Sequence, residues 1–330
     1  MHRKLLLVFA GALLALIFIT GCSDEKTGTI SPPPATPSDI SGADTAPPSA
    51  GTSNSAAPSD DTQKPVLDKL GALLKAPGNE KAVIAEIRQD ISKLSPENAD
   101  QMILAFEAYQ KEAIDGGSVL SSALTDLIRT AADEPYNEEA LNDLSKITNA
   151  DLKAELQDVF DKGYKIIVPE GMHEAVIDYG IYKDAAAYVS PDITAYIDIM
   201  AKESDSRMST DAAIIIPVDG VLKRAEASEA FIKNYPDSVI FDAIAQKYMI
   251  YVDAYFFGQD NTPAFDYTTK KLDQKFLDSY QKAASGSGDS AAAKAAAEYL
   301  NILKENGYTL TKVVADYRKN MTDELKAAAS

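Results

Sequence analysis

The sequence predicts an all-α fold in which about ten to twelve stacked, antiparallel helices follow a disordered N-terminal linker. Three observations favour this fold class. From residue 65 onward, apolar side chains recur at a spacing close to one helical turn. Capping residues precede several of these apolar stripes. The segment from residue 23 to 64 is rich in proline, serine, threonine and alanine, and it holds too few large apolar side chains to form a core.

The first residues have the layout of a secretory signal peptide. A basic start is followed by an apolar run from Leu5 to Ile19. At a helical rise of about 1.5 Å per residue, this run is shorter than the bilayer's hydrocarbon core of about 30 Å. We therefore expect residues 1–21 to be removed as a signal peptide, because the run is too short to span a membrane comfortably.

A lone cysteine follows this run. Ile19-Thr20-Gly21-Cys22 resembles the lipobox of bacterial lipoproteins, in which an aliphatic residue, two small or neutral residues and a cysteine occur in that order. The resemblance covers only the N-terminal segment, and it implies a diacylglyceryl group on the Cys22 sulfur and cleavage just before this residue. Fatty chains would then hold the protein on the extracytoplasmic side of the cell membrane. The alternative is an ordinary secreted protein with an unpaired thiol.

Composition limits the partners of the chain. We expect residues 22–64 to form a flexible tether between the lipid anchor and the folded part. The formal net charge of −18 disfavours binding to nucleic acid and to anionic lipid headgroups. No cysteine follows Cys22, so the folded part cannot form an internal disulfide or a thiolate metal site. The expected partner is an envelope protein or peptide, and no cofactor is expected.

Residues 65–170 and 171–330 are expected to form two helical subdomains, with the Pro169-Glu170-Gly171 turn between them. Two β-branched stretches, Lys165–Val168 and Ile214–Ile216, are each followed by proline. They are long enough to pair as a small ribbon, but we interpret them as buried connectors.

Two Ser-Pro-acid sequences indicate where helices begin. Ser95-Pro96-Glu97 and Ser190-Pro191-Asp192 each combine a capping hydroxyl, a proline suited to the first helical position and an acid near the positive end of the helix dipole. We therefore expect helices to begin at Pro96 and Pro191.

Part of the second half resembles tetratricopeptide-like extracytoplasmic proteins. Ala227-x3-Phe231 and the Tyr235-Pro236 turn resemble the end of a repeat, and Phe241-x2-Ile244-Ala245-x2-Tyr248 has the spacing of a repeat's first helix. No second copy follows at a steady period. The resemblance implies stacked helical hairpins, with Ala227 and Phe231 packed between paired helices and a concave surface available to a partner.

A tyrosine stripe crosses the same region. Tyr248, Tyr251 and Tyr255 recur at helical spacing. Because tyrosine combines an apolar ring face with a polar tip, the stripe is a candidate groove for a sugar or a peptide. The alternative is that the three rings belong to the core, where aromatic residues at helical spacing commonly pack.

One dipeptide favours an enzymatic alternative. Ala201-Lys202-Glu203-Ser204 resembles the catalytic Glu-Ser of lytic transglycosylases, helical enzymes that cleave peptidoglycan. The resemblance implies that Glu203 is the general acid, a role that requires a protonated carboxyl group in an apolar cleft. The Gly-Leu-Met-Gln type motif of that family is absent here, and so is tryptophan for sugar stacking.

A further alternative is a cation-binding envelope protein, with Glu203, Asp205, Asp211 and Asp260 as candidate ligands. His173, the single histidine beyond the leader, is expected at a helix start, and no G-x-S-x-G nucleophile elbow accompanies it. Since no complete catalytic set is present, the sequence predicts a non-enzymatic binding or scaffold module of the cell envelope.

Overall fold

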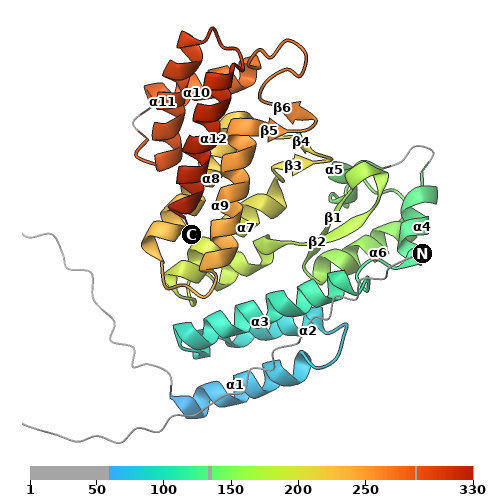
Figure 1. The fold of residues 1–330 in the computed structure, drawn as a ribbon. Coiled ribbons are helices and arrows are strands. Elements are labelled where there is room, and N and C mark those ends of the chain that lie inside the picture. The colour runs from blue at the N-terminus through green and yellow to red at the C-terminus, as the bar shows by residue number, and fades with distance from the viewer. Residues whose placement is uncertain (1–58, 133–135, 287, 330) are drawn as a thin grey trace, which may run out of the picture. The chain divides into compact units, whose positions relative to one another are not determined.

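The computed structural model describes residues 59–132, 136–286 and 288–329. Twelve α-helices, three short 3-10 helices and three two-stranded ribbons are present among these residues, so the predicted all-α fold class is confirmed (Figure 1). The predicted signal peptide, Cys22 and most of the predicted tether lie outside the described residues. None of the described helices is long and apolar enough to cross a lipid bilayer.

The helices account for most of the described chain. The α-helices are α1 (Asp60–Leu73), α2 (Glu80–Asp90), α3 (Pro96–Asp115), α4 (Ser122–Thr130), α5 (Glu138–Leu141), α6 (Ala150–Asp161), α7 (Pro191–Asp205), α8 (Val218–Asn234), α9 (Phe241–Phe257), α10 (Gln274–Ser285), α11 (Ala291–Glu305) and α12 (Lys312–Ala327). The 3-10 helices are η1 (Ile91–Lys93), η2 (Pro169–Gly171) and η3 (Tyr179–Ala185). Helix α1 thus begins inside the range expected for the tether.

The predicted helix starts are confirmed. Helix α3 begins at Pro96, where the Ser95 hydroxyl accepts a hydrogen bond from the Asn98 N–H at 3.4 Å. Helix α7 begins at Pro191 as predicted, but the Ser190 hydroxyl does not cap it and donates instead to the Asp192 carboxylate. The apolar stripes of the first helices lie inside the fold, as Met102 and Phe106 on α3 illustrate with no measurable exposure. Local capping and helical periodicity are therefore sufficient to place these elements.

Two hydrophobic clusters form the core. The first contains buried residues from Val66 to Ala201, together with Phe231 and Ile244, and the second runs from Met208 to Ala329. The first cluster ends at Ala201 on α7, apart from Phe231 and Ile244. In the second part, α8 packs against α9 and α10 packs against α11. The expected stacking of helical hairpins is therefore present.

The Ala227 position departs from the tetratricopeptide resemblance. Phe231 is buried, as the resemblance implies, but Ala227 is exposed on α8. Ala225 and Ser228 are the small residues of this helix that face the core. The close packing of α8 on α9 therefore uses a different face from the one that the repeat pattern implies.

The first β-branched stretch forms most of a strand, so its interpretation as a buried connector is wrong. Of the second stretch, only Ile214 lies in a strand. Strand β1 (Tyr164–Ile167) pairs antiparallel with β2 (Glu174–Ile177). Strand β3 (Ser209–Thr210) pairs with β4 (Ala213–Ile214), and Ile215 just beyond it is 52% exposed. Each stretch pairs with its nearest neighbour along the chain and not with the other. The third ribbon joins β5 (Gly258–Gln259) to β6 (Thr262–Pro263).

A tight turn joins β1 to β2. Glu170 and Gly171 both have positive φ angles, of 48° and 77°, which reverse the chain direction within a few residues. His173 directly precedes β2, so its expected position at a helix start is wrong. The β1–β2 ribbon then contacts α5 and α6 through β1 and α3 through β2.

Candidate functional site

The β1–β2 ribbon has one face in the core. Tyr164, Ile166 and Ile177 share this face and are buried, with Tyr164 opposite Ile177 and Ile166 opposite Ala175 in the register. The two long edges of the ribbon are in different environments. A strand edge that exposes its backbone N–H and C=O groups is a template for pairing with another chain, so the covering of each edge matters for function.

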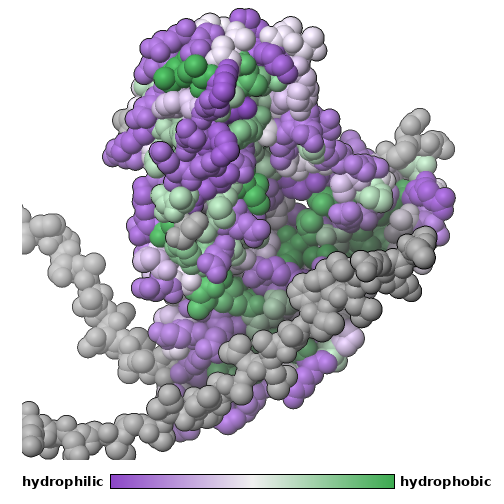
Figure 2. All heavy atoms as spheres, in the orientation of Figure 1, coloured by the Kyte–Doolittle hydropathy of each residue, from purple (hydrophilic) through white to green (hydrophobic). Residues whose placement is uncertain are grey.

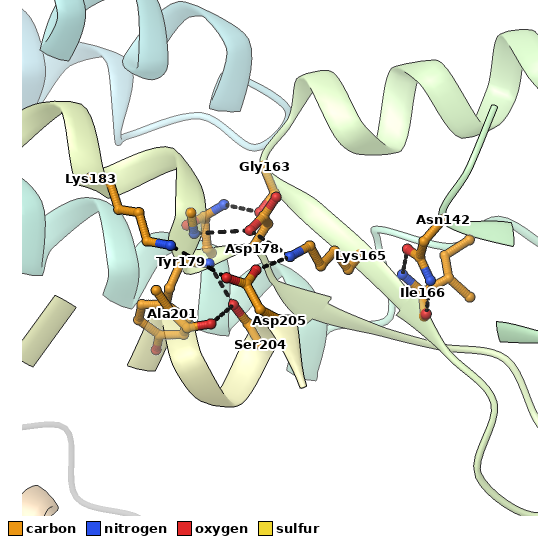
Figure 3. A network of polar contacts seen from close by, with 12 residues as sticks. Asn142, Gly163, Lys165, Ile166, Asp178, Tyr179, Lys183, Ala201, Ser204 and Asp205 are labelled. Carbon is orange, nitrogen blue, oxygen red and sulfur yellow. Dashed lines mark hydrogen bonds and ion pairs between the residues drawn. The ribbon is translucent and has the colours of Figure 1, made fainter. Parts of the chain in front are cut away.

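Side chains cap the outer edge of β1. The Asn142 Oδ1 accepts a hydrogen bond from the Ile166 N–H at 3.0 Å, and the Asn142 Nδ2 donates to the Ile166 carbonyl at 2.6 Å (Figure 3). The next outward N–H, of Val168, donates to Glu138 at 2.9 Å, and Arg207 forms an ion pair with the same carboxylate. The Asn142 carboxamide therefore makes the bonds that a neighbouring strand would make.

These hydrogen bonds fix which groups of β2 point outward. In an antiparallel pair, residues alternate between bonding to the partner strand and pointing away from it. Both backbone groups of Ile166 bind Asn142, so Ile166 and the opposite residue Ala175 do not bond to each other. The Asp178 N–H donates to the Gly163 carbonyl at 2.9 Å. The hydrogen-bonded pairs of the ribbon are therefore the ones that alternate with the Ile166–Ala175 pair.

The outer edge of β2 consequently presents a row of backbone groups. By the same alternation, the N–H and C=O groups of Ala175 and Ile177 point away from β1. Within the part of the chain that the structure describes, none of these groups has a hydrogen-bond partner. The edge of β1 is capped, whereas the edge of β2 is open.

Two adjoining hollows of about 330 Å³ and about 310 Å³ follow this open edge and share Ile114 and Ala175. Together they are called the β2 groove. Besides β2, the groove is lined by Ile114, Val119 and Leu120 from α3 and the loop after it, and by Met200, Glu203 and Ser204 from α7. Figure 2, in the orientation of Figure 1, shows hydrophobic residues gathered where the β1–β2 ribbon lies.

A polar network fixes the end of α7 to the ribbon (Figure 3). Lys165 forms ion pairs with Asp205 at 2.6 Å and with Asp178 at 3.1 Å. Burial disfavours the Lys165 ammonium ion, but its bonds to these two carboxylates outweigh burial and raise its pKa. Ser204 accepts a hydrogen bond from the Tyr179 N–H at 3.2 Å. These contacts hold the α7 side of the groove in place.

Glu203 lines the groove, but its carboxylate oxygens already have partners. One oxygen accepts the Met208 N–H at 2.8 Å, and the other accepts the Tyr251 hydroxyl at 2.9 Å and lies 3.3 Å from Nε of Arg224. A general acid must hold a proton and present it to the substrate. The geometry of Glu203 is instead that of a charged group connecting α7 to α8 and α9.

Two of the four candidate cation ligands already have other partners. Asp205 pairs with Lys165 and Lys183, while Asp211 accepts the Glu170 N–H at 3.1 Å. Among the described residues, no three histidine, cysteine or acidic side chains are grouped so that they could hold a metal ion. The structure therefore gives the cation hypothesis no ligand set in this part of the chain.

The tyrosine stripe lies in the core. Tyr248, Tyr251 and Tyr255 are exposed by only 2%, 3% and 0%, because α9 is packed between α8 and α12. Burial raises the pKa of all three hydroxyl groups. Of the two interpretations left open by the sequence, the structure supports the core, and the three rings do not line the β2 groove.

Sequence reasoning missed the residues that distinguish the two edges of the ribbon. Asn142 acts on a residue 24 positions away, and Ala175 becomes an edge residue only through its pairing with β1. The two adjacent β-branched residues Val176 and Ile177 were a weak strand signal. No protein-family model matches this chain, and comparisons with curated proteins and with solved structures gave no match.

Proposed function

We propose that the chain is a lipid-anchored, extracytoplasmic lipoprotein that serves as a non-enzymatic binding module of the cell envelope, with the β2 groove as its binding surface. The observation that supports binding is the largely apolar groove along an open strand edge, in a chain with a net charge of −18. Apolar surfaces bordered by polar residues are typical of protein interaction sites.

The anchor is supported by Ile19-Thr20-Gly21-Cys22 at the end of a short apolar run. Lipid chains on Cys22 would keep the protein at the membrane, and a flexible coil from Cys22 to the start of α1 would extend about 35 Å. This reach would let the groove meet partners above the lipid headgroups. Mass spectrometry of the native protein should show a lipidated Cys22 as its first residue, and an intact leader would contradict the anchor.

Photo-crosslinking in intact bacterial cells tests the binding surface. A photoreactive amino acid placed at Met200, in the groove, should yield discrete crosslinked species that depend on irradiation. The matched control is the same amino acid at Val313, which is 60% exposed on α12. Equal crosslinking at the two positions, or no crosslinking at Met200, would contradict the assignment of the groove as the binding surface.

A further inference from the structure

We propose that the β2 groove binds an extended segment of a partner polypeptide, which adds as a new antiparallel or parallel strand along the open edge of β2. This inference rests on the proposed binding function and specifies its mode. The partner segment pairs through its backbone and places alternate side chains in the groove.

The backbone row is the first argument. The outward N–H and C=O groups belong to the alternate residues Ala175 and Ile177, which lie about 6.6 to 6.8 Å apart in a strand. An extended polypeptide presents complementary groups at the same spacing. Folded proteins generally cover or charge such an edge, and the β1 edge of this ribbon is covered by Asn142. The β2 edge lacks such a cap among the described residues.

The surroundings of the edge favour a single extended segment. The groove is bounded by Ile114 on α3 and by Met200 on α7, so the edge lies between two helices of the fold. A second copy of this chain would have to bring its own helices into the same space. A single strand needs only about 5 Å beside β2, and its alternate side chains would meet the apolar hollows on either side of Ala175.

Charge further defines the partner. Glu174 is exposed on β2, Arg207 is already paired with Glu138, and the chain as a whole carries a net charge of −18. Acidic segments would be repelled. The expected partner segment is therefore neutral or basic, with apolar residues at alternate positions.

A library of random heptapeptides displayed on phage, selected against the purified full-length protein in detergent, provides the probe. We expect enriched peptides with alternating apolar residues and few acidic ones. Each selected peptide is then synthesised with one backbone nitrogen methylated at a time. Methylation should weaken binding about tenfold or more at alternate positions and have little effect at the positions between them. This period of two is the signature of strand pairing.

Ala175→Pro tests whether the β2 edge of the protein takes part in the pairing. Proline removes the outward N–H of this residue and leaves the bonds of the ladder with β1 in place. Peptide binding should fall about tenfold or more, while Ala175→Ser, which keeps the N–H, should bind as the parent does. Thermal unfolding of both variants reports on folding. If Ala175→Pro fails to fold, the methylation series still decides the question.

Several outcomes would overturn the inference. Peptides whose binding has no alternating dependence on methylation, or a library that yields no binder, would exclude strand addition. A concentration-dependent dimer that Ala175→Pro abolishes would assign the edge to a second copy of the chain. Tighter peptide binding after deletion of residues 23–58 would assign it to the chain's own tether. Crosslinks from Met200 without a methylation period of two would leave the binding function intact and remove only this mode.

Discussion

The two hydrophobic clusters both bury tyrosines, but the hydroxyl groups have different surroundings. In the first cluster, Tyr179 and Tyr196 both donate hydrogen bonds to the Glu107 carboxylate. Lys111, one turn further along α3, forms an ion pair with the same carboxylate at 2.7 Å. Glu107 itself is only 4% exposed. The packing of α3, η3 and α7 thus depends on the buried Glu107 carboxylate.

In the second cluster, the tyrosine rings contact one another. The centroid of the Tyr280 ring lies 5.2 Å from that of Tyr255 and 5.7 Å from that of Tyr299. Both pairs have an edge-to-face geometry. The Tyr280 hydroxyl donates to the Tyr255 carbonyl at 3.0 Å. The Tyr299 hydroxyl is buried and has no hydrogen-bond partner among the described residues. Around Tyr280, stability therefore comes from contacts between rings and not from a shared charge.

Equally buried tyrosines can therefore stabilise a fold for different reasons. Loss of a ring removes apolar contacts in both clusters, but loss of a hydroxyl should matter only where it solvates a buried charge. The following predictions separate these two contributions.

The largest expected effect is alkaline unfolding, which the two clusters share. Burial raises the pKa of Tyr179, Tyr196, Tyr255 and Tyr280 above the value of about 10 found in an unfolded chain. Below about pH 10 both states are protonated, so the stability is fully present. As the pH rises further, the unfolded state loses protons that the folded state retains, and the free energy of unfolding falls. Each such tyrosine contributes about 1.4 kcal/mol per pH unit.

Urea unfolding from pH 8 to 11.5, followed together with tyrosinate absorbance, checks this prediction. Tyrosinate from the buried rings should appear only with unfolding. Titration of most tyrosines near pH 10 in a chain that remains folded would show that the clusters are open to solvent.

Glu107→Ala should cause the next largest effect. The substitution leaves the Tyr179 and Tyr196 hydroxyls without their acceptor and opens a space in the core, so the free energy of unfolding should fall by about 4 kcal/mol. Glu112→Ala, at an exposed position on the same helix, is the matched control and should be nearly neutral. Equal effects in urea titrations of the two variants would refute a central role for the Glu107 charge.

Glu203→Ala tests the connection between the clusters. Arg224, whose side chain is 6% exposed, would lose its only acidic partner among the described residues, and Tyr251 would lose its acceptor. We expect a loss of about 3 kcal/mol in the free energy of unfolding. Asp198→Ala, at an exposed position on α7, is the control.

The same site separates the binding hypothesis from the enzymatic one. Cell-wall zymography should show no clearing that depends on Glu203. A clear band from the parent protein that Glu203→Gln abolishes, with folding intact, would establish the transglycosylase alternative and overturn the proposed non-enzymatic function.

The helices could be predicted from the sequence because their signals are local. The Ser95 cap, Pro96 and the stripe through Met102 and Phe106 all act within a few turns of one helix. The same periodicity identified the face of α9 that carries Tyr251. It could not show that α8 and α12 cover this face, because that depends on contacts between distant segments.

The candidate site could not be predicted because it depends on pairing between segments. The β-branched residues of β1 were visible, but β2 has a weaker strand pattern, and its open edge follows from the hydrogen bonds of Asn142 to Ile166. The Glu203-Ser204 dipeptide likewise carried no information about Arg224, which comes from a different helix. A two-residue motif indicates a catalytic role only when the side chains that surround it in the fold are known.

A pair of hydroxyl deletions gives the smallest and most selective test of the two clusters. Tyr196→Phe removes a hydrogen bond to the buried Glu107 carboxylate, so the free energy of unfolding should fall by about 1.5 to 3 kcal/mol. Tyr299→Phe removes a buried hydroxyl that has no partner among the described residues, so it should be neutral or stabilise the fold by up to about 1 kcal/mol. Because both changes keep the ring, the difference in urea midpoint at constant m-value isolates the hydroxyl. Equal losses in the two variants would mean that the Tyr299 hydroxyl has an acceptor in solution and that this ring is not held by apolar contacts alone.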